Sequence, residues 1–208
     1  MLKLALKITF LLGLVLSSIG LLRVSYFQLK ANAAQYLMQS AWREMVAEND
    51  NLVSQLKIKP WPWADTWPVF ELVIPQIGLT SLVLKDSSGE SLAFGPGLLS
   101  TQIMPGNRGN SFIAAHRDTH FRNIDRLKKG HLILITKQDG KRLTFLIDQV
   151  RIVDSRLESP ILFTDQKRLT LISCYPFDAK TPNTPYRYLV SGQLQDSITK
   201  PIAGAGVY

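Results

Sequence analysis

The chain has 208 residues, 46% of them hydrophobic, and its 24 Lys and Arg outnumber its 16 Asp and Glu for a formal net charge of +8. This composition suits one globular domain with an appendage, and it excludes collagen-like, heptad-repeat and disordered chains. A basic balance suits nucleic acid or an anionic lipid or envelope surface. No run of five Lys or Arg and no zinc-finger or basic-helix signature occurs, so we do not expect nucleic-acid binding.

Cysteine and histidine are scarce in this chain. Cys174 is the single cysteine, which excludes an internal disulfide, and three histidines are few for a zinc site. His116 and His120 stand four residues apart, but the Arg-Asp-Thr between them does not match the metalloprotease pattern. We therefore expect no metal and no other cofactor.

The first thirty residues predict a membrane anchor. An uncharged stretch runs from Ile8 to Leu22, and about 20 apolar residues cross a bilayer. A cleaved signal peptide is the alternative, with Ala31-Asn-Ala as its small-residue site, but that site lies far beyond the apolar stretch. We therefore assign residues 1–30 to a cytoplasmic end and a transmembrane helix. Lys and Arg on the two flanks are nearly balanced, so charge leaves the orientation open.

Residues 31–68 are predicted to connect the anchor to the body of the protein. Ala31–Leu56 lacks proline, which predicts an amphipathic helix that packs on the domain or lies on the membrane. Its apolar positions at roughly helical spacing are Tyr36, Leu37, Trp42, Met45 and Val46. Lys59–Pro68 (KPWPWADTWP) must run extended, because proline fixes φ and lacks a donor. We expect its three tryptophans to pack on a surface, either as a clamp between helix and domain or as a wall of a substrate groove.

Residues 69–208 are predicted to form a β domain, because short apolar runs alternate with turn residues. We expect strands at Val69–Ile74, Leu79–Leu84, Ser111–Ala115, Leu132–Thr136, Leu143–Ile147, Val150–Val153, Leu169–Ser173 and Arg187–Gln193. Turns are predicted at Gly95–Gly97 and at Asp139-Gly140, the second of which indicates a hairpin. About eight short strands with little helix indicate a small closed barrel or a sandwich.

Three side chains with useful chemistry fall at predicted strand ends next to loops. His116 follows Phe-Ile-Ala-Ala, Cys174 follows Leu-Thr-Leu-Ile-Ser, and Arg187 lies near the start of the last strand. A thiolate is a nucleophile, a nearby histidine can hold the charged form or protonate a leaving amine, and arginine supplies donors for an oxyanion. These three residue types together suffice for acyl transfer from a peptide.

Each of the three residues, taken alone, has an ordinary structural explanation. A lone cysteine in a strand is most often a small buried side chain. A histidine at a strand end is more often structural than catalytic, and an arginine among tyrosines usually stacks on their rings. Residue type and spacing alone therefore leave both a reactive site and a structural set open.

The motifs resemble those of one family, the sortases. Thr170–Cys174 (TLISC) is similar to the TLxTC signature that ends in the sortase nucleophile, with Ser173 in place of the usual threonine. Phe112–Thr119 (FIAAHRDT) resembles the sortase histidine segment in its AGHRDT form, with Ala115 in place of the frequent glycine. Arg187 falls where that family carries its arginine, and the order His, Cys, Arg also matches.

The likeness covers residues from about 60 to 195. The anchor, the helix and the Lys59–Pro68 segment also look like the branch found in Gram-negative marine proteobacteria. The resemblance implies a mainly β fold: a sortase-like, eight-stranded closed β-barrel with short helices, preceded by the transmembrane and amphipathic helices. Residues 69–208 would be the catalytic β-barrel domain. It also implies a single-pass enzyme of the cytoplasmic membrane, with the catalytic domain facing the periplasm or cell envelope.

The resemblance also implies roles for the site residues. Cys174 would be the nucleophile that attacks the Thr–Gly carbonyl of an LPxTG-like C-terminal sorting signal. His116 would act as general acid and base, and Arg187 would bind substrate and stabilise the oxyanion. An amine acceptor would then resolve the thioester. Asp118 and Thr119 are expected either to orient His116 or to form a structural turn.

Two other functions stay open from the sequence. A cysteine endopeptidase would use water as the acceptor, and a non-catalytic, membrane-tethered β-barrel would bind an envelope partner. The expected partners are a substrate protein that carries the sorting signal, an amine acceptor of unknown identity, and membrane lipid around the anchor. Ser173 is expected to support the site, since it keeps the hydroxyl of the family's threonine.

Overall fold

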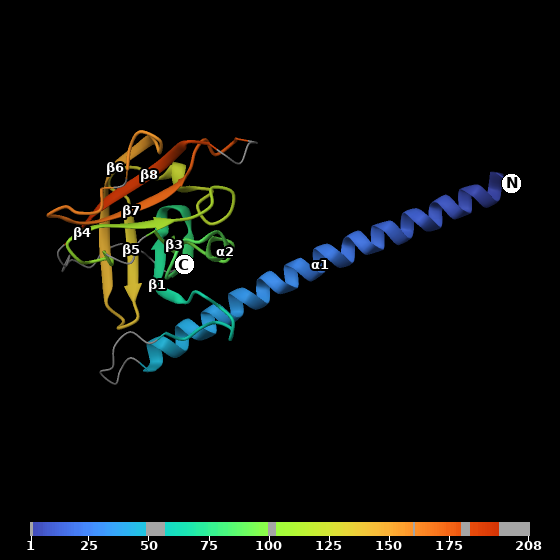
Figure 1. The fold of residues 1–208 in the computed structure, drawn as a ribbon, viewed down its shortest axis with the longest axis horizontal. Helices are drawn as coiled ribbons and strands as arrows, with labels where there is room; N and C mark the ends of the chain where they lie inside the picture. The colour runs from blue at the N-terminus through green and yellow to red at the C-terminus, as the bar shows by residue number, and fades with distance from the viewer. Residues whose placement is uncertain (1, 49–56, 100–102, 160, 180–183, 196–208) are drawn as a thin grey trace, which may run out of the picture. The chain divides into compact units, whose positions relative to one another are not determined.

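The computed structural model describes residues 2–48, 57–99, 103–159, 161–179 and 184–195, which form a long helix and a set of eight strands (Figure 1). The helices are α1 (Leu2–Glu48), the short α2 (Gly89–Leu92), and the 3-10 turns η2 (Pro75–Ile77) and η3 (Ile124–Arg126). The strands are β1 (Pro68–Ile74), β2 (Leu79–Leu84), β3 (Gly97–Leu98), β4 (Gly109–Ala114), β5 (Leu132–Lys137), β6 (Arg142–Asp154), β7 (Lys167–Cys174) and β8 (Tyr186–Leu194).

The strands close into a barrel in the order β1-β2-β3-β4-β7-β8-β6-β5, with β5 paired to β1. Neighbouring strands are antiparallel except at two places, where β3 runs parallel to β2 and β7 runs parallel to β4. Parallel neighbours bring their carboxyl ends to the same edge, so the residues that follow β4 and β7 emerge side by side. The prediction of a mainly β, closed eight-stranded barrel is confirmed, and the sandwich alternative is excluded.

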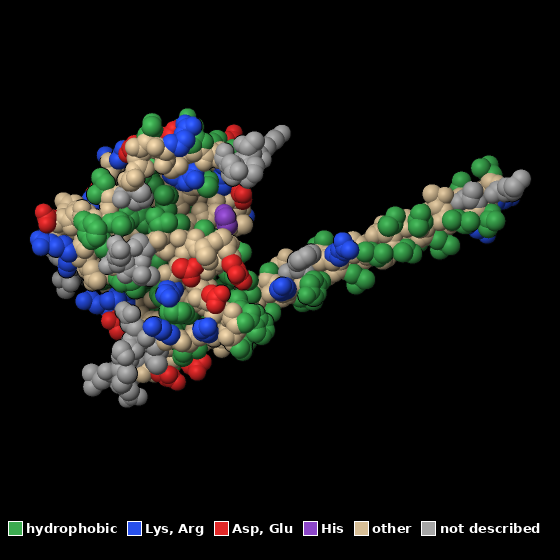
Figure 2. Space-filling view, viewed as in Figure 1, with side chains coloured by type: hydrophobic (Ala, Val, Ile, Leu, Met, Phe, Trp, Pro, Cys, Tyr) green, Lys and Arg blue, Asp and Glu red, His purple; other side chains and the backbone are tan. Residues whose placement is uncertain are grey.

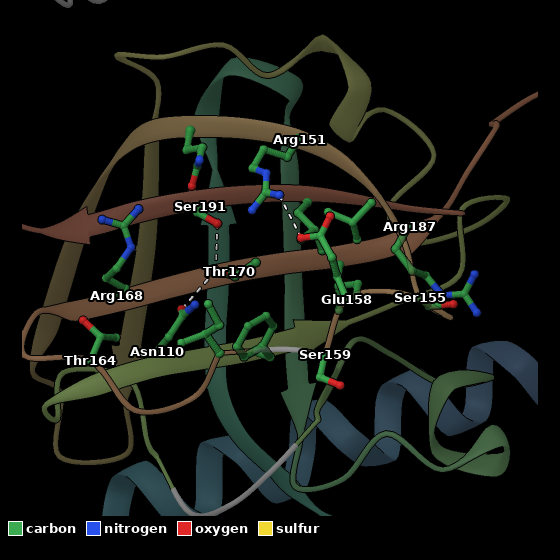
Figure 3. A pocket seen from close by; sticks show the side chains of 16 residues that line it. Asn110, Arg151, Ser155, Glu158, Ser159, Thr164, Arg168, Thr170, Arg187 and Ser191 are labelled. Atoms are coloured by element: carbon green, nitrogen blue, oxygen red, sulfur yellow. Dashed lines mark hydrogen bonds and ion pairs between the residues drawn. The ribbon is translucent and has the colours of Figure 1, made fainter. Parts of the chain in front are cut away.

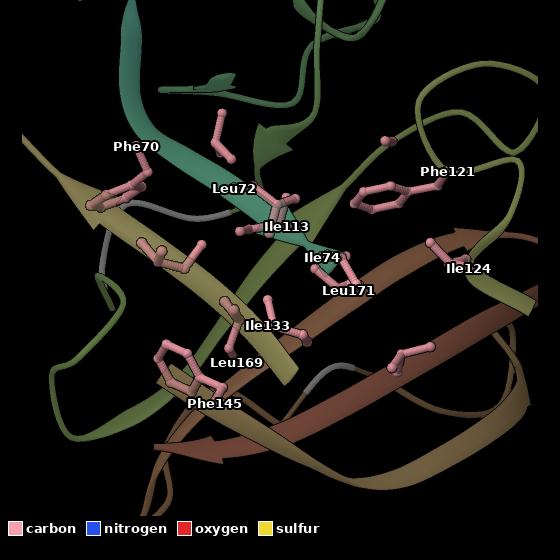
Figure 4. Close-up of a cluster of buried hydrophobic side chains, with 14 of the residues drawn as sticks. Phe70, Leu72, Ile74, Ile113, Phe121, Ile124, Ile133, Phe145, Leu169 and Leu171 are labelled. Carbon is pink, nitrogen blue, oxygen red and sulfur yellow. The ribbon is translucent and has the colours of Figure 1, made fainter. Parts of the chain in front are cut away.

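Alternating apolar residues from the strands fill the barrel interior (Figure 4). In β7, for example, Leu169 and Leu171 are fully buried, because successive side chains of a strand point to opposite faces. The fully buried residues that seven of the strands contribute include Leu72, Ile74, Val83, Ile113, Ile133, Ile135, Phe145, Leu169, Leu171 and Val190. Full burial of an aliphatic or aromatic side chain contributes about 1.5–3 kcal/mol. The packed core therefore holds the strand ends rigidly.

Two details of the strand prediction were wrong. The predicted strands Leu143–Ile147 and Val150–Val153 are one strand, β6, whose pairing with β8 shifts register between Ile147 and Gln149. This β-bulge adds a residue and interrupts the apolar alternation without ending the strand. The short β3 begins inside the turn predicted at Gly95–Gly97. A Cβ on Gly97 would clash with the backbone oxygen of Asp86, so glycine allows the close approach of the two segments there.

The predicted hairpin at Asp139-Gly140 is confirmed, and it joins β5 to β6. The Lys137 N–H donates to the Lys141 carbonyl at 2.9 Å, and Gly140 adopts a φ of 73°. Asp139 Oδ1 accepts the Lys141 N–H at 3.0 Å. Glycine tolerates this positive φ without a Cβ penalty, which is why the dipeptide predicted the turn.

The first of two compact units, Met1–Leu37, consists of the amino-terminal part of α1. Among the described residues, α1 is the one helix long and apolar enough to cross a membrane, with a mean hydropathy of 2.1 in its most apolar stretch. Large hydrophobic side chains from Leu2 to Leu29 are exposed along it (Figure 2). This surface fits lipid contact, as the anchor prediction requires. The helix continues without a break through residue 30, where the sequence predicts the end of the anchor segment.

The second unit, Met38–Tyr208, begins with the last turns of α1. Four residues at helical spacing are buried there: Met38, Ala41, Trp42 and Met45. Trp42 and Met45 belong to a small cluster on which Ile58, Trp67 and Leu82 pack. The helix prediction is confirmed up to Glu48, and its part in residues 49–56 lies outside the described residues. The predicted apolar stripe was wrong at Tyr36, Leu37 and Val46, which are exposed.

The Pro/Trp segment is extended with one turn, and β1 begins at its last proline. Trp61 packs edge-on against Phe94, with ring centroids 5.1 Å apart. Trp67 packs on both hydrophobic clusters and lies under the Lys85 ammonium, 4.3 Å from the ring centroid. Trp63 is 79% exposed, so the expectation that all three tryptophans pack was wrong. Two of them thus act as a structural clamp within the second unit.

Candidate active site

The parallel pairing of β4 and β7 places His116 and Cys174 at one edge of the barrel. Ala114, the last residue of β4, is the register partner of Ile172 in β7. His116 and Cys174 each lie two residues beyond that pair, and Cys174 is the last residue of β7. The Ala115 N–H still donates to the Ile172 carbonyl at 3.2 Å. The segments that follow β4 and lead along β7 therefore stay hydrogen-bonded up to Ala115, the residue before His116.

Arg187 reaches the same edge from the other side of β7. In the antiparallel ladder between β7 and β8, Cys174 is the register partner of Arg187. Directly opposite residues of an antiparallel pair project to the same face of the sheet. The structure thus brings Cys174, His116 and Arg187 together on the three adjacent segments β4, β7 and β8.

Cys174 faces the outside of the barrel, whereas Ser173 faces the inside. Leu171 is fully buried and Ser173 is 3% exposed, so the alternation of the strand places Ile172 and Cys174 on the outer face. Ser173 Oγ donates to the Ala115 carbonyl at 2.8 Å. This buried hydrogen bond ties the residue before Cys174 to the residue before His116.

The Arg187 guanidinium contacts the chain next to its own strand. Its Nη1 donates to the Thr184 carbonyl at 2.6 Å and to the Tyr186 carbonyl at 2.9 Å. No hydrogen bond joins the side chains of Cys174, His116 and Arg187 within the described part of the chain. Catalytic contacts are often long in structures without substrate, so this geometry is compatible with a catalytic set.

His116 is exposed and begins a turn that returns to the core. The Phe121 N–H donates to the His116 carbonyl at 3.1 Å, and Phe121 itself is fully buried. Asp118 and Thr119 are exposed on this turn. Asp118 Oδ1 lies 3.2 Å from Arg117 Nε, so its partner is the neighbouring arginine. A direct role of Asp118 or Thr119 toward His116 stays a prediction.

Arg117 is a site residue that the sequence analysis missed. It is 6% exposed, although it lies between two exposed residues. Its Nη1 donates to the Pro176 carbonyl at 2.9 Å and its Nη2 to the Ala179 carbonyl at 3.0 Å. We name Tyr175–Ala179 the post-cysteine segment, because it directly follows Cys174. Arginine is rarely buried without partners, but the sequence contains no local signal that shows where those partners lie.

His120 is a second histidine close to the site. Burial is the larger of the two causes that lower the pKa of its imidazole from 6.5, and the nearby His116 is the smaller. Both causes disfavour the protonated form, because burial removes water from the charge and a second cation repels it. In the sequence, His120 was considered only together with His116 as a possible metal-binding pair, which the intervening residues do not support. The spacing of four residues was the available signal that it lies near His116.

The start of the post-cysteine segment is hydrogen-bonded to the residues around the start of β8, and the segment carries two aromatic rings. The Tyr175 N–H donates to the Tyr186 carbonyl at 3.0 Å, and Thr184 Oγ1 donates to the Tyr175 carbonyl at 2.5 Å. Tyr188 stacks on Tyr175 at 6.1 Å and meets Phe177 edge-on at 5.3 Å. Burial and the nearby Asp125 raise the pKa of Tyr188 above 10.0, which keeps its phenol neutral. This aromatic group stiffens the chain beside Cys174.

A groove of about 350 Å³ lies on the outer face of β4, β7, β8 and β6 (Figure 3). Its floor includes Thr170, whose Oγ1 donates to Asn110 Oδ1 at 3.0 Å and lies 2.8 Å from Ser191 Oγ. Ile172 and Arg187 also line it, so the groove leads along the face on which Cys174 projects. None of the tryptophans of the Pro/Trp segment is among its described lining residues, which argues against that segment as a groove wall.

Two charged pairs border the groove. Arg151 Nη2 donates to Glu158 Oε2 at 2.8 Å, which links β6 to the loop between β6 and β7 (Figure 3). Arg168 makes a forked contact with Asp148, at 2.9 Å and 2.5 Å. Both arginines line the groove, and with Arg187 they give it a positive character that suits a peptide carbonyl chain or a carboxylate.

The described residues contain no group of three or more His, Cys, Asp or Glu that could hold a metal ion.

The fold and the motif residues match known proteins. A family model described as the sortase domain matches residues 72–195. Sortase D of Bacillus subtilis (strain 168) is 31% identical over 123 residues, which are 59% of this chain and 61% of that protein. The Clostridium perfringens Sortase D5 transpeptidase gives a TM-score of 0.63 at 21% identity, over 79% of this chain and 99% of that one. Clostridium perfringens sortase C, solved with the C-terminal cell wall sorting motif, gives 0.57 at 21% identity, over 81% and 90%.

A closed β-barrel that presents one thiol at a strand end, next to a histidine and an arginine, defines a class of candidate cysteine acyl-transfer proteins. The family match covers more than half of the chain, and the chain belongs to the sortase family. It spans 61% of the length of the Bacillus subtilis relative.

Proposed function

We propose that this protein is a membrane-anchored cysteine transpeptidase. The observation that carries the proposal is the register pairing of Cys174 with Arg187, which lines the groove, with His116 two residues beyond the end of the parallel neighbour strand. In the proposed site Cys174 would be the nucleophile, His116 the acid and Arg187 the oxyanion donor. Membership of the sortase family and the one apolar amino-terminal helix support it.

In the proposed reaction the Cys174 thiolate attacks a peptide carbonyl carbon and forms a tetrahedral intermediate. The Arg187 guanidinium donates to the oxyanion, which costs less in a preorganised site than in water. The carbon–nitrogen bond then breaks as protonated His116 gives its proton to the leaving amine, and a thioester remains. An incoming amine loses a proton to His116, attacks the thioester and releases the thiolate.

We propose an LPxTG-like C-terminal sorting signal as the substrate, cleaved between Thr and Gly. Two observations support this choice: the extended groove on β4, β7 and β8, and the similar fold of the sortase C solved with a C-terminal cell wall sorting motif. The groove has a volume of about 350 Å³, and the arginines that line it offer donors to the backbone carbonyls of a peptide.

The proposed location is the cytoplasmic membrane, with the barrel in the periplasm or at the cell envelope. The exposed apolar surface of α1 supports a single anchor. A sorting signal is carried by exported proteins, so the barrel must lie on the outer side to meet it. Protease protection of a carboxyl-terminal tag in sealed vesicles tests this orientation.

A single experiment tests the proposed function against its rivals. The full chain in detergent micelles is incubated with an LPxTG-like peptide, with and without a series of primary amines. We expect an amine-dependent product with a new amide bond, together with a thioester on Cys174 that mass spectrometry detects. Cleavage that no amine alters would favour a cysteine endopeptidase instead. Absence of cleavage, with peptide bound, would favour the non-catalytic barrel.

A further inference from the structure

Arg117 is buried beneath the active site and bonds to the chain that follows the nucleophile. Its three kinds of nitrogen are all occupied: Nη1 by the Pro176 carbonyl, Nη2 by the Ala179 carbonyl, and Nε by Asp118 Oδ1. The side chain is 6% exposed, while Asp118 is 73% exposed. The carbonyls of Pro176 and Ala179 belong to half-buried residues, and both hydrogen bonds to them are partly buried.

Burial makes these bonds structurally expensive to lose. A guanidinium carries five N–H donors in a rigid fork and stays charged in proteins, so it must find acceptors wherever it is buried. The two carbonyls lose their donors if the arginine is removed, and a partly buried carbonyl that loses its donor costs stability. Hydrogen bonds from a charged donor are also stronger than those from a neutral one.

The bonds connect the two segments that hold the reactive side chains. Arg117 directly follows His116, and Pro176 lies two residues after Cys174. A second link lies on the inner face, where Ser173 Oγ donates to the Ala115 carbonyl. Side-chain hydrogen bonds thus join the His116 and Cys174 segments before the reactive residues, through Ser173, and after them, through Arg117.

We propose that Arg117 is a positioning residue of the acyl-transfer site: it sets where His116 stands relative to Cys174 and fixes the post-cysteine segment beside the thiol. This inference rests on the proposed function. Phe177 lies within the segment and packs against the barrel core, so a fixed backbone there also fixes the aromatic group beside Cys174. An acid that is misplaced by about 1 Å can lower a rate by about 100-fold.

The test compares Arg117→Met and Arg117→Lys in the full chain in detergent micelles. Arg142→Met is the matched control, because Arg142 is exposed at the start of β6 and its replacement removes the same charge. Two quantities are measured: hydrogen exchange of the amides of Phe177, Asp178 and Ala179, and kcat and KM with an LPxTG-like peptide and an amine.

We expect Arg117→Met to speed exchange in the segment by about 10-fold or more, since the carbonyl bonds that hold it are lost. Its kcat should fall by about 100-fold while KM changes much less, because alignment acts in the transition state. Arg117→Lys should restore part of both, since an ammonium can reach one carbonyl but cannot fork between two. The control should match the wild type in both measurements.

Several results overturn the proposal. If Arg117→Met had the hydrogen-exchange rates and the kcat of the wild type, the contacts of Arg117 would fix neither the segment nor His116. Faster exchange with an unchanged kcat per folded molecule would leave a structural role and remove the positioning role. If Arg117→Met does not fold, the proposal is tested with Arg117→Lys alone. Wild-type activity and wild-type hydrogen exchange in Arg117→Lys would then count against it. If the wild type itself transfers no peptide, the proposed function fails, while the exchange measurement still shows whether Arg117 fixes the segment.

Discussion

Ser173 Oγ donates a buried hydrogen bond of 2.8 Å to the carbonyl of Ala115, between the parallel strand that ends in Cys174 and the segment that leads to His116. Ser173 therefore links the two segments from inside the barrel, and the groove of Figure 3 lies on the other face of the same strand. The hydroxyl of a small polar residue next to Cys174 can thus fix how the ends of β4 and β7 are positioned relative to each other.

This bond leads to the first prediction, for Ser173→Ala. The Ala115 carbonyl would lose its side-chain donor, which costs about 1–3 kcal/mol of stability for a buried group. We expect a lower midpoint in denaturant and a lower kcat, because His116 directly follows Ala115. Ser173→Thr keeps the hydroxyl and is the control, which should retain most of the activity. Equal rates for Ser173→Ala and the wild type would contradict a supporting role.

The second prediction concerns Cys174 itself. Cys174→Ala should lose turnover completely, because no other thiol is present in the chain. Cys174 is half-buried on the outer face, so the stability change should stay within about 1 kcal/mol. Denaturant unfolding followed by tryptophan fluorescence checks the fold, and peptide cleavage checks the activity. Retained cleavage would refute the nucleophile assignment, and unfolding would instead indicate a core cysteine.

The third prediction separates the charge of Arg187 from its shape. Arg187→Lys keeps the positive charge but cannot hold the Thr184 and Tyr186 carbonyls and also direct a second donor at an oxyanion. Loss of one oxyanion donor typically costs about 100–1,000-fold in kcat, and we expect a loss of that size. Arg151→Lys, at the groove border, is the comparison and should change KM more than kcat. A near-normal kcat in Arg187→Lys would remove Arg187 from the oxyanion role.

The sequence predicted the strands next to the candidate site well, because local pattern decides them. The apolar runs before Cys174 and His116 are both strands: β7 ends at Cys174, and β4 ends at Ala114, two residues before His116. The pairing of Cys174 with Arg187 depends on the register of two strands separated by a loop, which alternation does not set. The parallel contact between β4 and β7 joins segments more than fifty residues apart, and only closure of the whole barrel determines it.

Other features were missed because their causes are tertiary. Arg117 contacts the post-cysteine segment, which lies almost sixty residues later in the chain. Neither the type of this residue nor its neighbours in sequence therefore indicated that it is buried. β3 is two residues long, which is too short for any periodic pattern. Trp63 is exposed although tryptophans are usually packed, and nothing in the described part of the barrel explains its position.

The last prediction concerns acid stability and His120. Burial first, and repulsion by His116 second, lower the pKa of His120 from 6.5 in the folded state. The unfolded chain therefore binds more protons than the folded protein once the pH falls through about 6.5, and stability must rise with pH in that range. We expect the free energy of unfolding to fall between about pH 7 and pH 5, and His120→Gln to flatten this dependence. Denaturant midpoints in steps of pH measure it.

His116→Gln distinguishes the two causes of the His120 shift. Repulsion is the smaller cause, so this variant should flatten the pH dependence less than His120→Gln does. A slope that disappears completely in His116→Gln would show that repulsion, and not burial, controls His120. An unchanged slope in His120→Gln would mean that other groups determine acid stability, and His120 would then have no part in it.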